Sequence, residues 1–333
     1  MKSNIGAKII DVARFLPEHI AIPQMNEEEK NDPLLQNDFF KSPKERRFAF
    51  PQYSSADLGT MAMKELLGRT GISPTKIDLI LYSCAITDYV NIGIGPDIQH
   101  RSGATNATVL QIDTGCVSFL SMLNTADAFI RAGRYKTIAI VTVTNFISRL
   151  KDFQRSPKSW VLGDGASATL VVAGTPNILA SQEQSFGENY GLMVCQPRGK
   201  NNEVQHYWDT GAGPLQVEFS EGMIERLKHN AVSLVSESVK ASIAKAGFRT
   251  EDISLLITHQ PNVGLIKQWR LAIGIDEPRV YDTFQRYGNL FQSSIPVTIS
   301  DAVDCGKIRA NDTIAMGTFS NGGDFVGSMV LRW

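Results

Sequence analysis

The stretch "GISPTKIDLILYSC" at residues 71–84 has a near copy, "GFRTEDISLLITHQ", at residues 247–260. Each copy begins with a glycine after a helix-like run and continues through a short polar loop. Each then ends in a run rich in Ile and Leu, which is typical of a buried strand. The two copies are 176 residues apart, and this spacing suggests that the chain contains two similar halves.

Two further pairs of segments follow in the same order. "YKTIAIVTVT" (135–144) comes after Gly133 and "NDTIAMGTFS" (311–320) after Gly306, with 173 residues between the glycines. "GDGASATLVVAG" (163–174) and "GGDFVGSMVLRW" (322–333) end the two halves. Ordered pairs at a near-constant spacing indicate a duplicated unit in which helices alternate with strands. We therefore predict an α/β fold with an N-terminal half at 1–173 and a C-terminal half at 174–333, built on largely parallel, doubly covered sheets.

The composition excludes several classes of function. The 333 residues carry a net charge of −1, with acids and bases mixed, so no basic stripe suggests nucleic-acid binding. No window reaches membrane-spanning length, and residues 1–23 lack a signal-peptide pattern. The cysteines are scattered without a CxxC pair, which argues against a zinc site or a disulfide framework. They are Cys84, Cys116, Cys195 and Cys305. We expect a cytoplasmic protein.

The repeat brings three reactive residue types into equivalent places. The spacing of 173 carries Cys116 onto Asn289, and each follows a glycine, so both are predicted to open equivalent helices. The spacing of 176 carries Ser83 onto His259, at the C-terminal end of a predicted strand. Strand ends and helix starts are where open α/β sheets assemble their sites. We therefore expect Cys116, His259 and Asn289 to meet.

These three side chains suit thioester chemistry. A cysteine at a helix N-terminus is expected to have a lowered thiol pKa and to act as a nucleophile, although most free cysteines are small core residues. A neutral histidine can hydrogen-bond a substrate oxygen, and an asparagine can only orient or donate, or else cap a helix. An acyl group on Cys116 could then react with a second thioester that loses CO2 while His259 and Asn289 stabilise its carbonyl oxygen.

Seven motifs along nearly the whole chain carry a family resemblance. They are "AKIIDVARFLPE" (7–18), "KERRFAF" (44–50), "DTGCVSF" (113–119), "GDGASATLV" (163–171), "HQPN" (259–262), "RYGNLFQSSIP" (286–296) and "SNGGDFVGSMVLRW" (320–333). In this order they resemble the motifs of thiolase-fold condensing enzymes, specifically the β-ketoacyl-ACP synthase III group. The resemblance implies a thiolase-like fold of two duplicated halves in a layered αβαβα arrangement.

The resemblance also implies roles for particular residues. Cys116 would be the nucleophile, His259 and Asn289 the decarboxylation donors, and the backbone N–H groups of Cys116 and Gly322 the oxyanion hole. Substrate contacts would fall to Asn262 for the pantetheine arm and to Arg47 and Arg155. Acyl groups would arrive as coenzyme A or acyl-carrier-protein thioesters, no metal or redox cofactor would be needed, and the enzyme would be a homodimer.

Departures from the family pattern narrow these expectations. The segment "NDPLLQNDFFKSPKERR" (31–47) lacks the Trp and Arg that hold coenzyme A in acetyl-CoA-priming members, and Ser118 replaces a glycine after the nucleophile. These changes favour a relative in specialised fatty-acid or polyketide metabolism. Two alternatives stay open. One is an acyltransferase that passes the acyl group to an alcohol or amine. The other is a non-catalytic partner subunit of a heterodimeric ketosynthase, which would be expected to lack Cys116.

Overall fold

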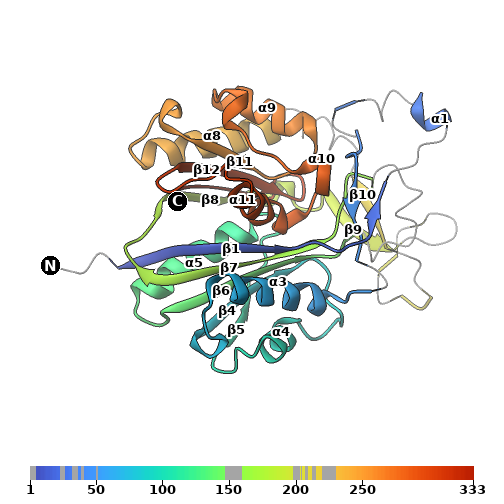
Figure 1. Ribbon diagram of the computed structural model, residues 1–333. Helices are drawn as coiled ribbons and strands as arrows, with labels where there is room; N and C mark the ends of the chain where they lie inside the picture. The colour runs from blue at the N-terminus through green and yellow to red at the C-terminus, as the bar shows by residue number, and fades with distance from the viewer. Residues whose placement is uncertain are drawn as a thin grey trace.

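The computed structural model describes most of the chain. The described residues are 5–22, 27–31, 37–38, 41–49, 52–146, 160–197, 203, 205–206, 209–211, 215–219 and 230–333. Arg155, one of the predicted substrate residues, lies outside them. Figure 1 shows the described elements stacked in layers, with the two halves of the chain one above the other.

Two sheets form the frame of the molecule. The first runs in the order β1 (Gly6–Phe15), β7 (Gly165–Gly174), β6 (Thr137–Thr144), β4 (Leu79–Cys84) and β5 (Thr108–Gln111). The second runs in the order β11 (Leu255–Thr258), β12 (Thr313–Ser320), β13 (Phe325–Arg332) and β8 (Ile178–Ser185). Two small antiparallel ribbons pair β9 (Met193–Pro197) with β10 (Leu215–Phe219) and β2 (Ile20–Ala21) with β3 (Arg46–Arg47).

Helices cover both sheets and fill the space between them. On the outer face of the first sheet lie α3 (Ser55–Thr70) and α4 (Gly95–Ser102), and on the outer face of the second lie α8 (Val232–Lys245) and α9 (Val263–Ile273). Between the sheets lie α5 (Ser118–Arg131) and α11 (Ser294–Asp304), whose apolar side chains share one core with both sheets. Two short helices are α1 (Glu27–Lys30) and α10 (Phe284–Tyr287). The predicted αβαβα arrangement is confirmed.

The duplication is visible in the positions where equivalent elements begin. The strands β4 and β11 begin at Leu79 and Leu255, the central helices at Ser118 and Ser294, and β6 and β12 at Thr137 and Thr313, each pair 176 residues apart. The glycines that follow the central helices are only 173 apart because α11 has 11 residues where α5 has 14. The loop after α11 is correspondingly longer.

This difference corrects one expectation. At a spacing of 176 the counterpart of Cys116 is Gln292, and Asn289 stands three residues before it. Asn289 does not open α11, because a 3₁₀ turn at Phe291–Ser293 separates it from Ser294, the first residue of the helix. Cys116, in contrast, lies two residues before α5, as predicted.

The sheets are mixed rather than largely parallel. In the first sheet β4 pairs in parallel with β5 and β6, whereas β7 pairs antiparallel with β6 and β1. In the second, β11 and β12 are parallel and β13 is antiparallel to both of its neighbours. A helix can connect parallel strands, whereas the tight turn after β12 forces an antiparallel return. In sequence order, β7 is the last strand of the first sheet and ends at Gly174, and β8 of the second sheet begins at Ile178. The domain boundary after residue 173 stays a prediction.

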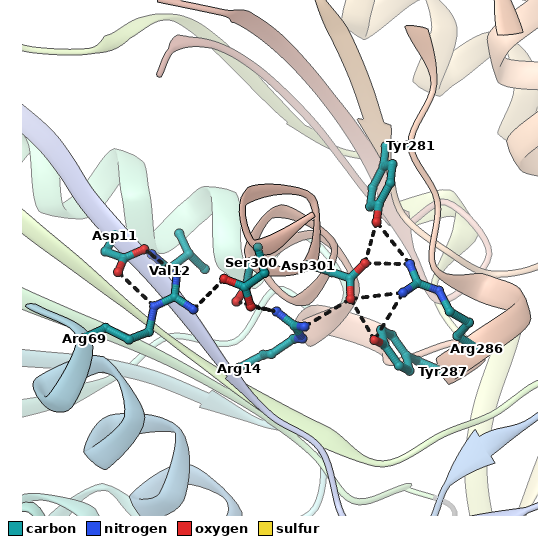
Figure 2. A network of polar contacts seen from close by, with 10 residues as sticks. Asp11, Val12, Arg14, Arg69, Tyr281, Arg286, Tyr287, Ser300 and Asp301 are labelled. Carbon is teal, nitrogen blue, oxygen red and sulfur yellow. Dashed lines mark hydrogen bonds and ion pairs between the residues drawn. The ribbon is translucent and has the colours of Figure 1, made fainter. Parts of the chain in front are cut away.

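A network of charged and phenolic side chains joins the two halves around Asp301 of α11 (Figure 2). The Asp301 carboxylate is 2% exposed and accepts hydrogen bonds from the hydroxyls of Tyr281 (2.6 Å) and Tyr287 (2.7 Å). It is also paired with the guanidinium groups of Arg286 and of Arg14, which comes from β1 in the first half. Burial by itself would raise the pKa of Asp301, but these hydrogen bonds outweigh it and lower the pKa below its usual value.

The network continues along β1 to helix α3. Arg14 donates to Ser300 (3.1 Å) and is paired with Asp304, and Arg69 of α3 bridges Asp304 (2.8 Å) and Asp11 (2.9 Å). The chain of contacts therefore ties an outer helix of the first half to the central helix of the second. It also anchors α10, and with it the loop that carries Asn289.

Replacing Asp301 should destabilise this junction strongly. An Asp301→Asn variant leaves Arg286 and Arg14 without their buried counter-ion. We expect the free energy of unfolding to fall by about 3 kcal/mol, and not by more, because both arginines can still reach water. Urea denaturation measures this loss. Asp304→Asn is the matched control, because Asp304 is 38% exposed, and its loss should stay below about 1 kcal/mol. Equal losses would contradict the central position given to Asp301.

Candidate active site

Cys116 lies in the turn that leads from β5 into α5. Gly115 has a φ of 57°, and a Cβ there would come within 2.7 Å of the Cβ of Ser320, so the turn requires glycine where it meets the end of β12. The hydroxyl of Thr318, also on β12, donates to the carbonyl of Cys116 (3.3 Å). The Cys116 side chain is buried, in an apolar cluster that includes Leu162 and Phe291.

The expected lowering of the thiol pKa is wrong. Burial raises the pKa of Cys116, and the carboxylates of Asp324 and Asp113 raise it further, while a hydrogen bond with its own backbone N–H opposes them only in part. The position before a helix does not compensate for the loss of water around the sulfur. The resting thiol is therefore protonated, and it must lose its proton as it attacks.

Asp324 is a charged group of this site that sequence reasoning missed. It belongs to the turn between β12 and β13, is buried, and accepts hydrogen bonds from Ser320 (2.8 Å), Asn321 (3.1 Å) and the N–H of Phe325 (2.9 Å). These donors fix a carboxylate near the nucleophile. The sequence signal was available as an acidic residue inside the glycine-rich ending "SNGGDF".

Neutralising Asp324 should make the cysteine more reactive. Because its carboxylate raises the thiol pKa, an Asp324→Asn variant should alkylate at Cys116 up to about tenfold faster at pH 8, a change equal to one pKa unit. The measurement is the rate of iodoacetamide labelling, followed by intact mass. Asp113→Asn should shift the rate in the same direction but less, since Asp113 contributes less to the shift. A slower reaction in Asp324→Asn would overturn this assignment.

His259 follows β11 directly, at the C-terminal end of the strand, as predicted. Its backbone N–H donates to the carbonyl of Gly317 (2.8 Å), which holds it against β12. The ring is 3% exposed and lies edge-on to Phe319 at 6.1 Å between centroids, and its Nδ1 has no hydrogen-bond partner among the described residues. Burial lowers the pKa of His259 to about 3, so its imidazole is neutral near pH 7.

The buried neutral imidazole makes stability depend on pH. Below a pH of about 6.5 the unfolded chain binds a proton at His259, whereas the folded protein does so only near a pH of about 3. Stability therefore falls as the pH drops through this interval. Between pH 7 and pH 5 the wild type should lose about 2 kcal/mol more than a His259→Asn variant, measured by urea denaturation at each pH. Parallel curves for the two proteins would contradict a neutral buried ring.

Asn289 is held between α10 and the 3₁₀ turn that precedes α11. Its backbone pairs with the segment before β7: its N–H donates to Val161 (2.6 Å), and its carbonyl accepts from Gly163 (3.0 Å). The preceding Gly288 has a φ of 69°, and a Cβ there would lie 2.7 Å from the carbonyl oxygen of Val161. The Oδ1 atom of Asn289 accepts from the N–H of Phe291 (2.8 Å). Within the described part of the chain its Nδ2 donates to no residue.

The structure brings the three residues together through shared neighbours. Cys116 and His259 bind adjacent positions of β12, at Thr318 and Gly317. Asn289 is bridged to Leu162, which packs in the same cluster as Cys116. Cys116 and His259 thus lie beside the end of β12, and Asn289 is linked to the cluster of Cys116 through Leu162.

A glutamine missed by sequence reasoning connects two of the loops. Gln260 is 1% exposed, and its Oε1 accepts from the backbone N–H groups of Thr283 (2.9 Å) and Phe284 (3.2 Å) at the start of α10. Its Nε2 donates to the carbonyl of Thr258 (2.8 Å). The residue after His259 therefore fixes the helix that leads to Asn289. Its place in "HQPN" was the available signal.

The other predicted residues belong to three separate elements of the structure. Gly322 is in the turn after β12, with a φ of 101°. Asn262 caps α9, where its Oδ1 accepts from the N–H of Leu265 (2.8 Å). Arg47 is half-buried, donates to the carbonyl of Pro17 (3.5 Å) and pairs with Glu45 (3.8 Å). Their roles toward a substrate stay predictions.

Two negative findings concern the described residues alone. No helix in that part of the chain is both long and apolar enough to cross a membrane. No group of three or more His, Cys, Asp and Glu side chains there is arranged to hold a metal ion.

Comparison with known proteins identifies the family. Residues 110–187 match the family model described as 3-oxoacyl-[acyl-carrier-protein] synthase III, and residues 243–333 match the model of its C-terminal region. The β-ketoacyl-[acyl-carrier-protein] synthase III of Clostridium acetobutylicum is 29% identical over 332 residues, which cover 98% of this chain and 99% of that protein. The chain is a β-ketoacyl-ACP synthase III-like condensing enzyme.

Solved structures agree on the thiolase fold of this synthase III-like enzyme. The 3-oxoacyl-[acyl-carrier-protein] synthase III from Aquifex aeolicus VF5 has a TM-score of 0.81 at 24% identity, covering 98% of this chain and 100% of that one. The priming β-ketosynthase of the R1128 polyketide biosynthetic pathway has a TM-score of 0.84 at 19% identity, with 98% and 96% covered. The synthase III-like enzyme is a transferase that forms carbon–carbon bonds, similar in sequence to the β-ketoacyl-[acyl-carrier-protein] synthases III.

Proposed function

We propose that the enzyme loads an acyl group on Cys116 and joins it to a malonyl- or β-ketoacyl-type thioester by decarboxylative Claisen condensation. The observation that supports this most is the state of the two other side chains. His259 is buried and neutral, and Asn289 has its oxygen occupied and its amide free among the described residues. Two neutral N–H donors suit a carbonyl oxygen that becomes negative during the reaction.

In the loading step, the sulfur of Cys116 attacks the carbonyl carbon of an acyl thioester. The bond to the donor sulfur breaks, the donor leaves as a free thiol, and the proton of Cys116 is transferred to it. The backbone N–H groups of Cys116 and Gly322 stabilise the oxyanion. This role is supported by the close contact between Ser320, which precedes the turn that carries Gly322, and Gly115, the residue before Cys116, where a Cβ would lie 2.7 Å from the Cβ of Ser320.

In the condensation step, the second thioester loses CO2 and its carbonyl becomes an enolate held by His259 and Asn289. The enolate carbon attacks the acyl-cysteine, a carbon–carbon bond forms, and Cys116 is released and takes up a proton. The pKa of about 3 lies far below neutrality, so the imidazole of His259 is neutral at every pH well above that value. At such a pH it can donate its N–H to this oxygen. No metal or redox cofactor takes part in either step.

We infer that both substrates are phosphopantetheine thioesters, carried by coenzyme A or by acyl carrier protein, with Asn262, Arg47 and Arg155 contacting the carrier arm. The changes at residues 31–47 and at Ser118 support a role in specialised fatty-acid or polyketide metabolism rather than acetyl-CoA priming.

The test is to incubate the protein with a panel of acyl-CoA and acyl-carrier-protein thioesters and to follow its intact mass. We expect an acyl adduct on Cys116, then CO2 release and a β-ketoacyl product when a malonyl thioester is added. An adduct that passes only to alcohols or amines would favour an acyltransferase instead. The absence of an adduct with every donor would overturn both and favour a non-catalytic subunit.

We also propose that the enzyme is a homodimer that pairs through its first sheet. The edge strand β5 pairs with β4 alone among the described strands, and Leu110 on it is 40% exposed. An uncovered edge strand with an apolar residue is a template for pairing with a second copy. The loop after β4 exposes Tyr89, Val90 and Ile92 as well. Sedimentation analysis should give twice the chain mass, and a monomer at micromolar concentration would contradict the proposal.

A further inference from the structure

Phe291 has an unusual backbone for its residue type. Its φ of 45° lies in the left-handed region, which a bulky aromatic residue rarely adopts. Among the described residues, the other non-glycine positions with positive φ are Asn311 and Asn321, and asparagine tolerates this region. Strained backbone held in place by its surroundings is often part of a functional site. Phe291 stands two residues after Asn289.

The ring of Phe291 is fixed on the side of the nucleophile. It is 8% exposed and stacks on Phe146, with 4.7 Å between ring centroids and 24° between planes. Both rings belong to the buried apolar cluster that contains Cys116, together with Leu162 and Phe48. A stacked aromatic pair resists displacement, because each ring would lose its contact with the other. The pair therefore presents a rigid wall to whatever is bound to the sulfur.

The backbone of Phe291 has a separate task. Its N–H donates to Oδ1 of Asn289 (2.8 Å), which leaves the Nδ2 of Asn289 as the free end of the carboxamide. The left-handed turn thus orients Asn289, while the ring that follows from it points into the cluster around Cys116. Phe291 therefore contributes to both proposed steps, with its ring beside Cys116 and its N–H on Asn289.

The rest of the cluster is apolar and only partly buried. Met193 and Cys195 of β9 and Leu215 and Val217 of β10 alternate along the two strands, and Val217 pairs with Cys195. Alternating residues of a strand lie on one face, so these four form an apolar face of the ribbon that packs against the cluster. This face is suited to an unbranched hydrocarbon chain that extends away from the sulfur.

We propose that Phe291, braced by Phe146, is a specificity-determining residue that limits the acyl group on Cys116 to straight-chain acyl thioesters. The rings exclude branches and aromatic rings next to the acyl carbonyl, and the ribbon β9–β10 takes the linear chain. The proposal rests on the proposed function, since it concerns the acyl group carried by Cys116.

The test uses Phe291→Gly, because glycine adopts a positive φ freely and keeps the N–H that orients Asn289. The rate of adduct formation is measured with butyryl-, isobutyryl- and benzoyl-CoA. We expect the wild type to favour butyryl-CoA by about tenfold or more, and Phe291→Gly to reduce that preference by about tenfold, in the range that pocket contacts of this size provide.

Two further variants separate the outcomes. Phe146→Ala removes the brace on a different segment and should relax the preference in the same direction, which gives an independent result if Phe291→Gly does not fold. Phe129 of α5 packs edge-to-face on Tyr135, and Phe129→Ala should leave the preference unchanged. Adducts with an unaltered preference in both Phe291→Gly and Phe146→Ala overturn this inference alone. The absence of any adduct in the wild type overturns the proposed function with it.

Discussion

A Cys116→Ala enzyme should acquire no acyl group from any thioester donor, and its condensation rate should fall by on the order of 10⁴-fold or more, as when other covalent nucleophiles are removed. The reason is that alanine lacks the sulfur that takes the acyl group at the start of α5. Intact mass after incubation with butyryl-CoA measures the first effect, and product formation with a malonyl thioester the second. Release of CO2 from the malonyl thioester alone should persist, because His259 and Asn289 are unchanged.

Cys195→Ala is the matched control for this experiment. Cys195 packs against the same cluster as Cys116, and burial raises its thiol pKa to about 11, so it is a second weakly acidic thiol in a similar environment. We expect this variant still to form the adduct, on Cys116. An adduct that persists in Cys116→Ala and disappears in Cys195→Ala would assign the nucleophile to β9 instead.

The fold could be predicted because its strands are buried and repeated. Residues 71–84 and 247–260 each keep a glycine, a polar loop and an apolar run, and the structure gives them equivalent places as β4 and β11. Strand direction was not predictable in the same way, since an apolar run is equally suited to either direction. The short turn at 321–324 makes β13 antiparallel to β12, and the apolar runs of the repeat do not carry that information.

The sequence predicted which residues form the site better than it predicted their pKa values and backbone geometry. The spacing of 173 led to Asn289, yet this spacing reflects the shorter α11, and the structural counterpart of Cys116 is Gln292. The thiol pKa depends on burial and on Asp324, which approaches only when the last hairpin folds back over the turn at Gly115. The left-handed backbone of Phe291 has no local signal either, because nothing in "NLFQSS" favours a positive φ. These properties arise from tertiary packing.

An Asn289→Ala enzyme should separate the two half-reactions. Loading of Cys116 should remain within about threefold of the wild type, because Asn289 contacts the segment at Val161–Gly163 through its backbone, which alanine keeps. Decarboxylation of a malonyl thioester should slow by about 10²–10³-fold, the effect of removing one donor from a developing oxyanion. The first rate is measured as adduct formation by intact mass, and the second as CO2 release in the absence of an acyl donor.

Gln292→Ala is the matched control, since Gln292 is a second buried carboxamide in the same loop, whose Nε2 already donates to the carbonyl of Val143 (2.6 Å). Its loss should lower stability and affect both half-reactions alike. Asn289→Asp refines the test further, because the carboxylate keeps the acceptor for the N–H of Phe291 but removes the donor and adds repulsion toward an enolate. If Asn289→Ala and Gln292→Ala reduce loading and decarboxylation in the same proportion, Asn289 acts as a structural residue, and stabilisation of the enolate must be assigned to His259 alone.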